Sequence, residues 1–310
     1  MTTSPASARS LICRSPEDVL AAVPVILGFE PAESLVMLTF GGRETFHARV
    51  DLPPDETRSE EVIGLLLEPA RQHLIRRVMF VAYSTRAELA DSVLDGLRGA
   101  FVSAGIEVGM DLRADGTQWF LPGQPGVPYD VAAHRFRVDS VLEGQVVSRS
   151  REELAARLEP TAGVALVEKA ARRAVPATPT EVAVAVWRAL GQGRFENAEL
   201  AAVLLGMQHV PGRDAAWSGM GRDDAAQHVE LWTDAVQRSP AQLVGGPAAV
   251  LAFASWLAGN GALAWCAVDR CLEVEPDNSL ADLVSELLGR AVPPSTWGEG
   301  AALSIEEEAG

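Results

Sequence analysis

The hydrophobic pattern of the first half of the chain predicts alternating helices and strands. Ser15 followed by Pro16 and two acids is typical of a helix start, and Gly28 is a suitable end for that helix. Two β-rich runs, 34–40 and 45–52, are joined by a Gly-Gly turn and predict a hairpin. The continuous apolar run 76–84 predicts a central buried strand.

Helical spacing recurs on both sides of that central run. Residues 57–74 and 85–105 predict two helices, and Pro69 is expected to kink or end the first. Further strands are predicted at 106–112 and 117–121, around an Asp-Gly turn. We therefore predict a mixed α/β sheet domain over residues 11–173.

The second half of the chain shows helical spacing only. Helical patterns run from 132 to 160 and on to Lys169, and AVPATPT at 174–180 predicts a linker. Nothing from 179 to 289 predicts a strand, so we expect an all-α domain at 181–290 and an α+β protein overall. Residues 1–10 are expected to be disordered, and 291–310 to form an acidic flexible tail.

The end of the helical half has the spacing of a tetratricopeptide repeat. With Gly259-Asn260 as the turn, small, bulky, small and proline positions fall at Ala264, Val268, Cys271 and Pro276. Gly193 begins a weaker echo 66 residues earlier, close to two repeats. The alternative is a plain helical bundle with incidental spacing. Asn278 or Ser279 is expected to cap a following helix.

Composition narrows the classes of partner. The formal net charge is −16, which argues against nucleic acid and against anionic membrane surfaces. Three cysteines without a CxxC pair suggest neither a disulfide framework nor a zinc site, so we expect a cytoplasmic protein without metal or cofactor. No run reaches the ~18 apolar residues of a membrane span.

Two short segments hold the candidate binding residues, and no catalytic residue is assigned. Glu33 and Ser34 lie where a loop enters a strand, a position that often lines a cleft, although they could merely form a turn. In RDAAW, Arg213 could clamp a carboxylate or phosphate. Alternatively, Arg213 and Asp214 pair with each other or cap a helix, with Trp217 packed beneath.

Several strings together resemble one known family. They include SPEDVLAAVPVILGFEPAESLVML (15–38), HARVDLP (47–53), RDAAW (213–217) and WLAGNGALAWCAVDRCLEVEPDNSLADLVSELL (256–288). As a set they resemble the actinobacterial domain-of-unknown-function family numbered 4192, from about residue 10 to 297. The resemblance implies no established activity. Many such members have a cysteine-bearing segment where this chain has WFLPGQPGVPYD, so a metal or redox role there is unsupported.

Two function hypotheses follow from the sequence. The first is a non-enzymatic binding or scaffold protein that presents a groove of the helical domain to a protein partner. Repeat-like spacing and the lack of catalytic motifs motivate it. The alternative is a small-ligand-binding or enzymatic site at the strand ends near Glu33 and Ser34, since α/β domains commonly bind ligands there.

Overall fold

The computed structural model describes residues 12–42, 46–142 and 146–297, and the chain forms two compact units. Unit 1 is Met1–Leu154 and unit 2 is Ala155–Gly310. The disorder expected at 1–10 lies outside the described residues, as does most of the acidic tail. The hairpin turn after Gly42 is likewise outside them.

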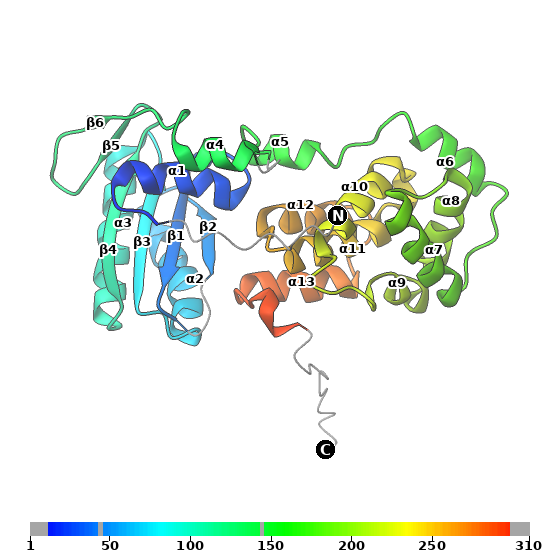
Figure 1. Cartoon of the computed structure of the whole chain (residues 1–310). Coiled ribbons are helices and arrows are strands. Elements are labelled where there is room, and N and C mark those ends of the chain that lie inside the picture. The colour runs from blue at the N-terminus through cyan, green and yellow to red at the C-terminus, as the bar shows by residue number, and fades with distance from the viewer. Residues whose placement is uncertain (1–11, 43–45, 143–145, 298–310) are drawn as a thin grey trace, which may run out of the picture. The chain divides into compact units, whose positions relative to one another are not determined.

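Unit 1 is a sheet with helices on both faces (Figure 1). Its elements in chain order are α1 (Pro16–Leu27), β1 (Ser34–Phe40), β2 (His47–Asp51), η1 (Glu56–Arg58), α2 (Ser59–Gln72), β3 (Arg77–Tyr83), α3 (Ala87–Ser103), β4 (Glu107–Ala114), β5 (Gln118–Phe120), β6 (Val127–Pro128) and α4 (Arg135–Leu142). The boundary with unit 2 falls within α5 (Arg151–Ala156). The mixed sheet confirms the predicted fold class.

The strand order is β2-β1-β3-β4-β5-β6, with the predicted central strand β3 in the interior. β1 pairs antiparallel with both β2 and β3, which confirms the hairpin. β3 and β4 are parallel, connected through α3. Consequently β3 and β4 end at the same edge of the sheet, and β1 begins there.

Alternation along the strands sends apolar side chains to two cores. On one face, α2 and α3 cover the sheet, and the rings of Phe80 and Phe101 meet edge to face at 5.0 Å. On the other face, α1 packs Leu20 against residues such as Val36 and Leu112. α4 lies against α1, where Phe136 packs on two alanines of that helix.

Local signals explain both ends of α1, whereas Pro69 does not end α2. The Ser15 hydroxyl accepts the N–H of Asp18, and Gly28 ends α1 in the left-handed conformation at φ 77°. α2 does not stop at Pro69 but continues to Gln72, because the proline carbonyl still accepts the N–H of His73 and closes the last turn. The missing proline N–H therefore costs one hydrogen bond without ending the helix.

Unit 2 is entirely helical over its described residues (Figure 1). After α5 its elements are α6 (Val164–Ala171), α7 (Pro179–Gln192), α8 (Asn197–Gly206), α9 (Val210–Trp217), α10 (Ala225–Arg238), η2 (Ala241–Leu243), α11 (Gly245–Leu257), α12 (Gly261–Leu272), α13 (Ser279–Gly289) and η3 (Pro294–Thr296).

The division between the units falls earlier than the boundary expected at 173. α6 packs against α8 and α10, so its apolar side is buried in unit 2. The helical pattern of 132–160 contains two short helices, α4 and α5. The expected linker, 174–180, lies inside unit 2, where Thr178 and Glu181 form a capping box at the start of α7.

The segment that suggested a repeat forms a helix pair. α11 and α12 pack together, with Gly259 in the left-handed conformation at φ 80° in the short turn between them. Cys266 and Cys271 are buried on α12 as packing residues. Gly193 likewise ends α7 at φ 79°. The comparison with tetratricopeptide repeats stays a prediction.

Candidate functional site

A pocket of about 400 Å³ lies in unit 1 at the edge where β3 and β4 end. Tyr83 is the last residue of β3 and Ala114 is the last of β4, and both line it. Arg137 and the loops 30–33, 84–85, 115–116 and 129–132 complete the lining. The carboxyl ends of parallel strands are a common place for ligands in α/β folds.

Tyr83 is a buried polar residue of this pocket. The residue is 8% exposed, and its hydroxyl has no hydrogen-bond partner among the described residues. Burial raises the pKa of Tyr83 well above its usual value, and the nearby Tyr129 and Glu30 raise it further. A buried hydroxyl without a partner costs about 1–3 kcal/mol, so it signals a missing interaction.

Ser34 lies directly opposite Tyr83 in the antiparallel pairing of β1 and β3. Opposite residues of such a pair project from the same face, so the two side chains are neighbours. The Ser34 hydroxyl is also buried and has no hydrogen-bond partner in the described part of the chain. The predicted residue Ser34 therefore lies beside the pocket lining rather than in it.

Glu33, the other predicted residue of this segment, does line the pocket. Its carboxylate accepts hydrogen bonds from the Ser84 hydroxyl at 3.1 Å, the Thr85 N–H at 3.3 Å and Arg86 Nε at 2.8 Å. Partial burial raises the pKa of Glu33, but the hydrogen bonds from Arg86, Ser84 and Thr85 outweigh it and lower the pKa overall. Glu33 also has a positive φ of 43°, a strained conformation for a residue with a side chain.

Two aspartates on the opposite loops add negative charge. Asp115 Oδ1 accepts the N–H groups of Thr117 and Gln118, each at 2.8 Å, and Asp130 Oδ1 accepts the N–H of Ala132 at 2.9 Å. Desolvation raises the pKa of Asp115, but the hydrogen bonds from Gln118 and Thr117 lower it overall, so this side chain is ionised at neutral pH. These bonds confirm the Asp-Gly turn expected here.

Tyr129 lies among these charges. Burial raises the pKa of Tyr129, and the neighbouring carboxylates Asp115 and Glu30 raise it further. Glu30 itself is ion-paired with Arg137. The chain contains two tyrosines, and both line this pocket.

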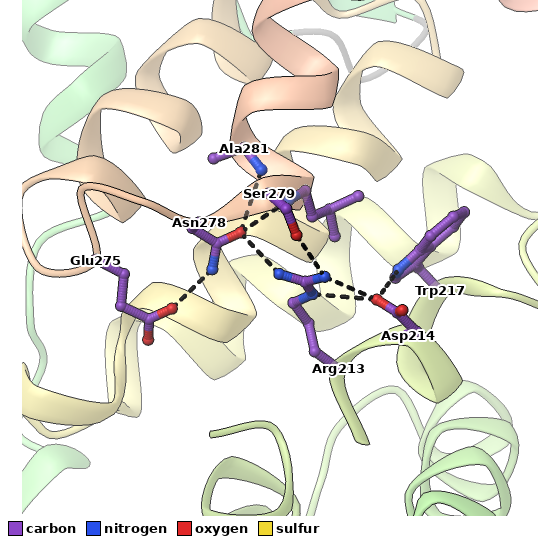
Figure 2. Close-up of polar contacts among 8 residues, drawn as sticks. Arg213, Asp214, Trp217, Glu275, Asn278, Ser279 and Ala281 are labelled. Atoms are coloured by element: carbon purple, nitrogen blue, oxygen red, sulfur yellow. Dashed lines mark hydrogen bonds and ion pairs between the residues drawn. The ribbon is translucent and has the colours of Figure 1, made fainter. Parts of the chain in front are cut away.

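The second predicted site, around Arg213, is a closed network in unit 2 (Figure 2). The guanidinium of Arg213, which is 7% exposed, donates to Asp214 Oδ1 and Ser279 Oγ at 3.0 Å and to Asn278 Oδ1 at 3.2 Å. Asn278 Oδ1 also accepts the N–H groups of Leu280 and Ala281 and so caps α13, as predicted. Arg213 therefore links α9 to the start of α13.

Asp214 and Trp217 belong to the same network. Asp214 Oδ1 accepts the indole N–H of Trp217 at 3.2 Å, as Figure 2 shows. The Trp217 ring packs on Phe253 at 4.9 Å and on Trp297 at 5.8 Å. Gly212 lets α9 come close to α8, because a Cβ there would lie 2.2 Å from the Gly206 carbonyl oxygen. These contacts correspond to the packing alternative for RDAAW.

Neither region resembles a metal centre. Within residues 12–42, 46–142 and 146–297, no three His, Cys, Asp or Glu side chains are grouped to hold a metal ion. Searched over the same part of the chain, no helix combines the length and apolarity needed to cross a membrane.

Comparison with known proteins identifies a family. The family model described as "Domain of unknown function (DUF4192)" matches residues 16–295. The chain belongs to this family. Neither the curated proteins nor the solved structures that were searched gave a match. The pocket and the Arg213 network both lie within the part of this DUF4192 chain that the family model covers.

Sequence reasoning found one edge of the pocket and missed the others. Glu33 was identifiable because a loop enters a strand there. Tyr83, Asp115 and Asp130 were not identified, because their meeting depends on β4 lying parallel to β3. A usable signal was present: two tyrosines are few for 310 residues, and each lies next to a predicted strand end or loop.

Proposed function

We propose that this DUF4192 protein binds a small molecule in the pocket at the ends of β3 and β4. The observation that carries the proposal is the Tyr83 hydroxyl, which is buried at a pocket of about 400 Å³ without a hydrogen-bond partner in the described structure. That volume lies in the range of small-molecule sites. A ligand that bonded this hydroxyl would remove a free-energy cost that the free protein bears.

The placement of charged groups also supports ligand binding. Glu33 is held by three donors in a strained backbone conformation, which is typical of residues kept for a site rather than for stability. The proposal concerns binding, and it assigns no catalytic residue. We further propose a cytoplasmic location, which the small number of cysteines and the lack of a CxxC pair support.

Thermal-shift screening of the full chain against metabolite classes tests the proposal. A ligand of the native state stabilises it by RT ln(1 + L/Kd), where L is the free ligand concentration, so the melting temperature rises with ligand concentration. Each stabilising compound is then titrated against Tyr83→Phe, which removes only the hydroxyl. The proposal predicts at least one compound whose affinity falls about fivefold or more in this variant. If no compound is sensitive to Tyr83→Phe, the pocket is not the site.

A second candidate function is protein binding through α7 of unit 2. Trp187 is 78% exposed on this helix, and Val184, one turn away, is also exposed. Tryptophan is enriched at the centres of protein interfaces, which favours the scaffold hypothesis for this face.

Photo-crosslinking tests whether this face of α7 binds a protein. A photoreactive residue at position 187 should give a discrete crosslinked product, and the same residue at exposed Arg172 should not. Equal products from both positions would indicate collisional contact only.

A further inference from the structure

The lining of the pocket carries an excess of negative charge. Four carboxylates, those of Glu30, Glu33, Asp115 and Asp130, line it together with one guanidinium, that of Arg137. Arg137 pairs with Glu30, and Glu33 pairs with Arg86 just outside the lining. A cleft lined by one sign of charge concentrates ligands of the opposite sign and repels anions such as phosphates.

Asp115 and Asp130 are the carboxylates left for a ligand. Neither carboxylate forms an ion pair with a Lys, Arg or His of the described residues, although the charge of Arg113 helps to lower the pKa of Asp115. Their known hydrogen bonds all use Oδ1, from backbone N–H groups and the Thr117 hydroxyl within the same turns. The second oxygen of each carboxylate, Oδ2, therefore has acceptor capacity left for a ligand.

The tyrosines of the pocket also suit a positively charged ligand that donates hydrogen bonds. The hydroxyl of Tyr83 can accept a hydrogen bond as well as donate one, and it has no partner in the described structure. The rings of Tyr83 and Tyr129 provide aromatic surface, which attracts cations. A bare divalent metal ion is less suitable, because the described His, Cys, Asp and Glu side chains include no group of three placed to hold one.

Resting on the small-ligand function proposed above, we infer that the ligand is an organic amine bound as its ammonium cation. Its N–H groups donate to the carboxylates of Asp115 and Asp130 and to the buried hydroxyl of Tyr83. Its hydrocarbon part lies against the tyrosine rings and the apolar lining. The charge of the ammonium group offsets the repulsion between carboxylates that share one small pocket.

Titration of the full chain with three probes of equal chain length tests the charge of the ligand. Putrescine is the dication, butanediol the neutral analogue and succinate the dianion. Binding of each probe is measured by changes in amide chemical shifts in NMR spectra. Putrescine is expected to bind to residues of the pocket, and the other two are not. Raising the ionic strength from about 0.01 M to about 0.15 M shortens the screening length from about 30 Å to about 8 Å and should weaken its binding.

Isosteric variants test the named carboxylates. Asp115→Asn and Asp130→Asn keep Oδ1 for the turn hydrogen bonds and remove one negative charge each. Each should weaken putrescine binding by about fivefold or more. Asp55→Asn is the matched control, because Asp55 Oδ1 also accepts the N–H of a residue two positions on, and Asp55 does not line the pocket. It should leave the affinity unchanged.

The outcomes separate the amine inference from the pocket itself. If putrescine does not bind at millimolar concentration, or binds equally well to both pocket variants, the amine inference is overturned. If butanediol or succinate binds instead and its affinity falls in Tyr83→Phe, the pocket is the site but the ligand is not an amine. If no compound of the wider screen responds to Tyr83→Phe, the proposed function itself fails.

Discussion

The pocket of unit 1 and the Arg213 network of unit 2 each contain a buried polar side chain, but the two side chains differ in their hydrogen bonding. Arg213 is buried and bonded to three side chains of its own unit, one of which also caps a helix. Tyr83 is equally buried, yet its hydroxyl has no partner in the described residues. A saturated network holds helices together, whereas an unsaturated group in a pocket has capacity left for a ligand.

The largest expected effect on stability comes from removing Arg213 from its hydrogen-bond network. Arg213→Ala removes the link between α9 and α13, because Asp214, Asn278 and Ser279 each lose the hydrogen bonds that this buried guanidinium donates. We expect the free energy of unfolding to fall by about 3 kcal/mol, measured by urea denaturation.

Arg172→Ala serves as the control for this substitution. Arg172 pairs with Glu168 on the exposed surface of the same unit, so its loss should cost less than about 0.5 kcal/mol. Equal losses for the two variants would mean that the Arg213 network is not a stabilising link.

A smaller loss is expected from Asn278→Ala, which removes the cap of α13. Two backbone N–H groups and Arg213 lose the same acceptor, so we expect a loss of about 2 kcal/mol. Asn278→Asp keeps the acceptor and should restore most of that stability, as measured by the same denaturation experiment. An aspartate variant as unstable as the alanine variant would assign the effect to the Asn278 N–H bond to Glu275 instead.

A substitution in the pocket should change the free energy of unfolding in the opposite direction. Tyr83→Phe removes a buried hydroxyl that has no partner in the described structure, so the free protein should become more stable by about 1 kcal/mol. A rise in melting temperature by calorimetry, together with weaker ligand binding, would set this region apart from the Arg213 network. A loss of stability would show that the hydroxyl is already satisfied in the free protein.

The smallest expected effect on stability concerns His228, a buried polar residue of unit 2 that does not belong to the Arg213 network. His228 on α10 is buried, and neither ring nitrogen has a hydrogen-bond partner among described residues, although Asp224 lies 3.7 Å away. Burial lowers the pKa of His228, and Asp224 opposes this in part. As the pH falls below about 6.5, the ordinary histidine value, the unfolded chain takes up a proton that the folded chain does not.

Stability should therefore decrease as the pH falls through this range, until the lower pKa of the folded state is passed. His228→Gln should lack this part of the pH dependence. Urea denaturation of both proteins at about pH 7.5 and about pH 5.5 measures the difference, which isolates His228 from the other histidines. Identical pH dependence would contradict a neutral buried imidazole.

Local features of the fold were predictable where a few adjacent residues decide them. Ser15 and Gly28 bound α1, and Asn278 caps α13, because capping depends on side chains within one turn. The boundary between the units was harder to predict from the sequence, because α6 joins unit 2 through packing with helices far along the chain.

The candidate site follows the same rule. Glu33 was identifiable from its own loop, but its bonds to Ser84 and Arg86 span more than 50 residues of sequence. The role of Arg213 depends on Asn278, 65 residues away. A single sequence gives the chemical type of such residues and not which of them meet.

The two tyrosines give the protein a built-in spectroscopic reporter. Both line the pocket of unit 1, and the chain has no others. Uniform incorporation of fluorotyrosine would thus yield two fluorine resonances, one from the buried ring of Tyr83 and one from the more accessible ring of Tyr129. Every change in that spectrum would originate at the pocket, without a tag, a mutation or an assigned backbone.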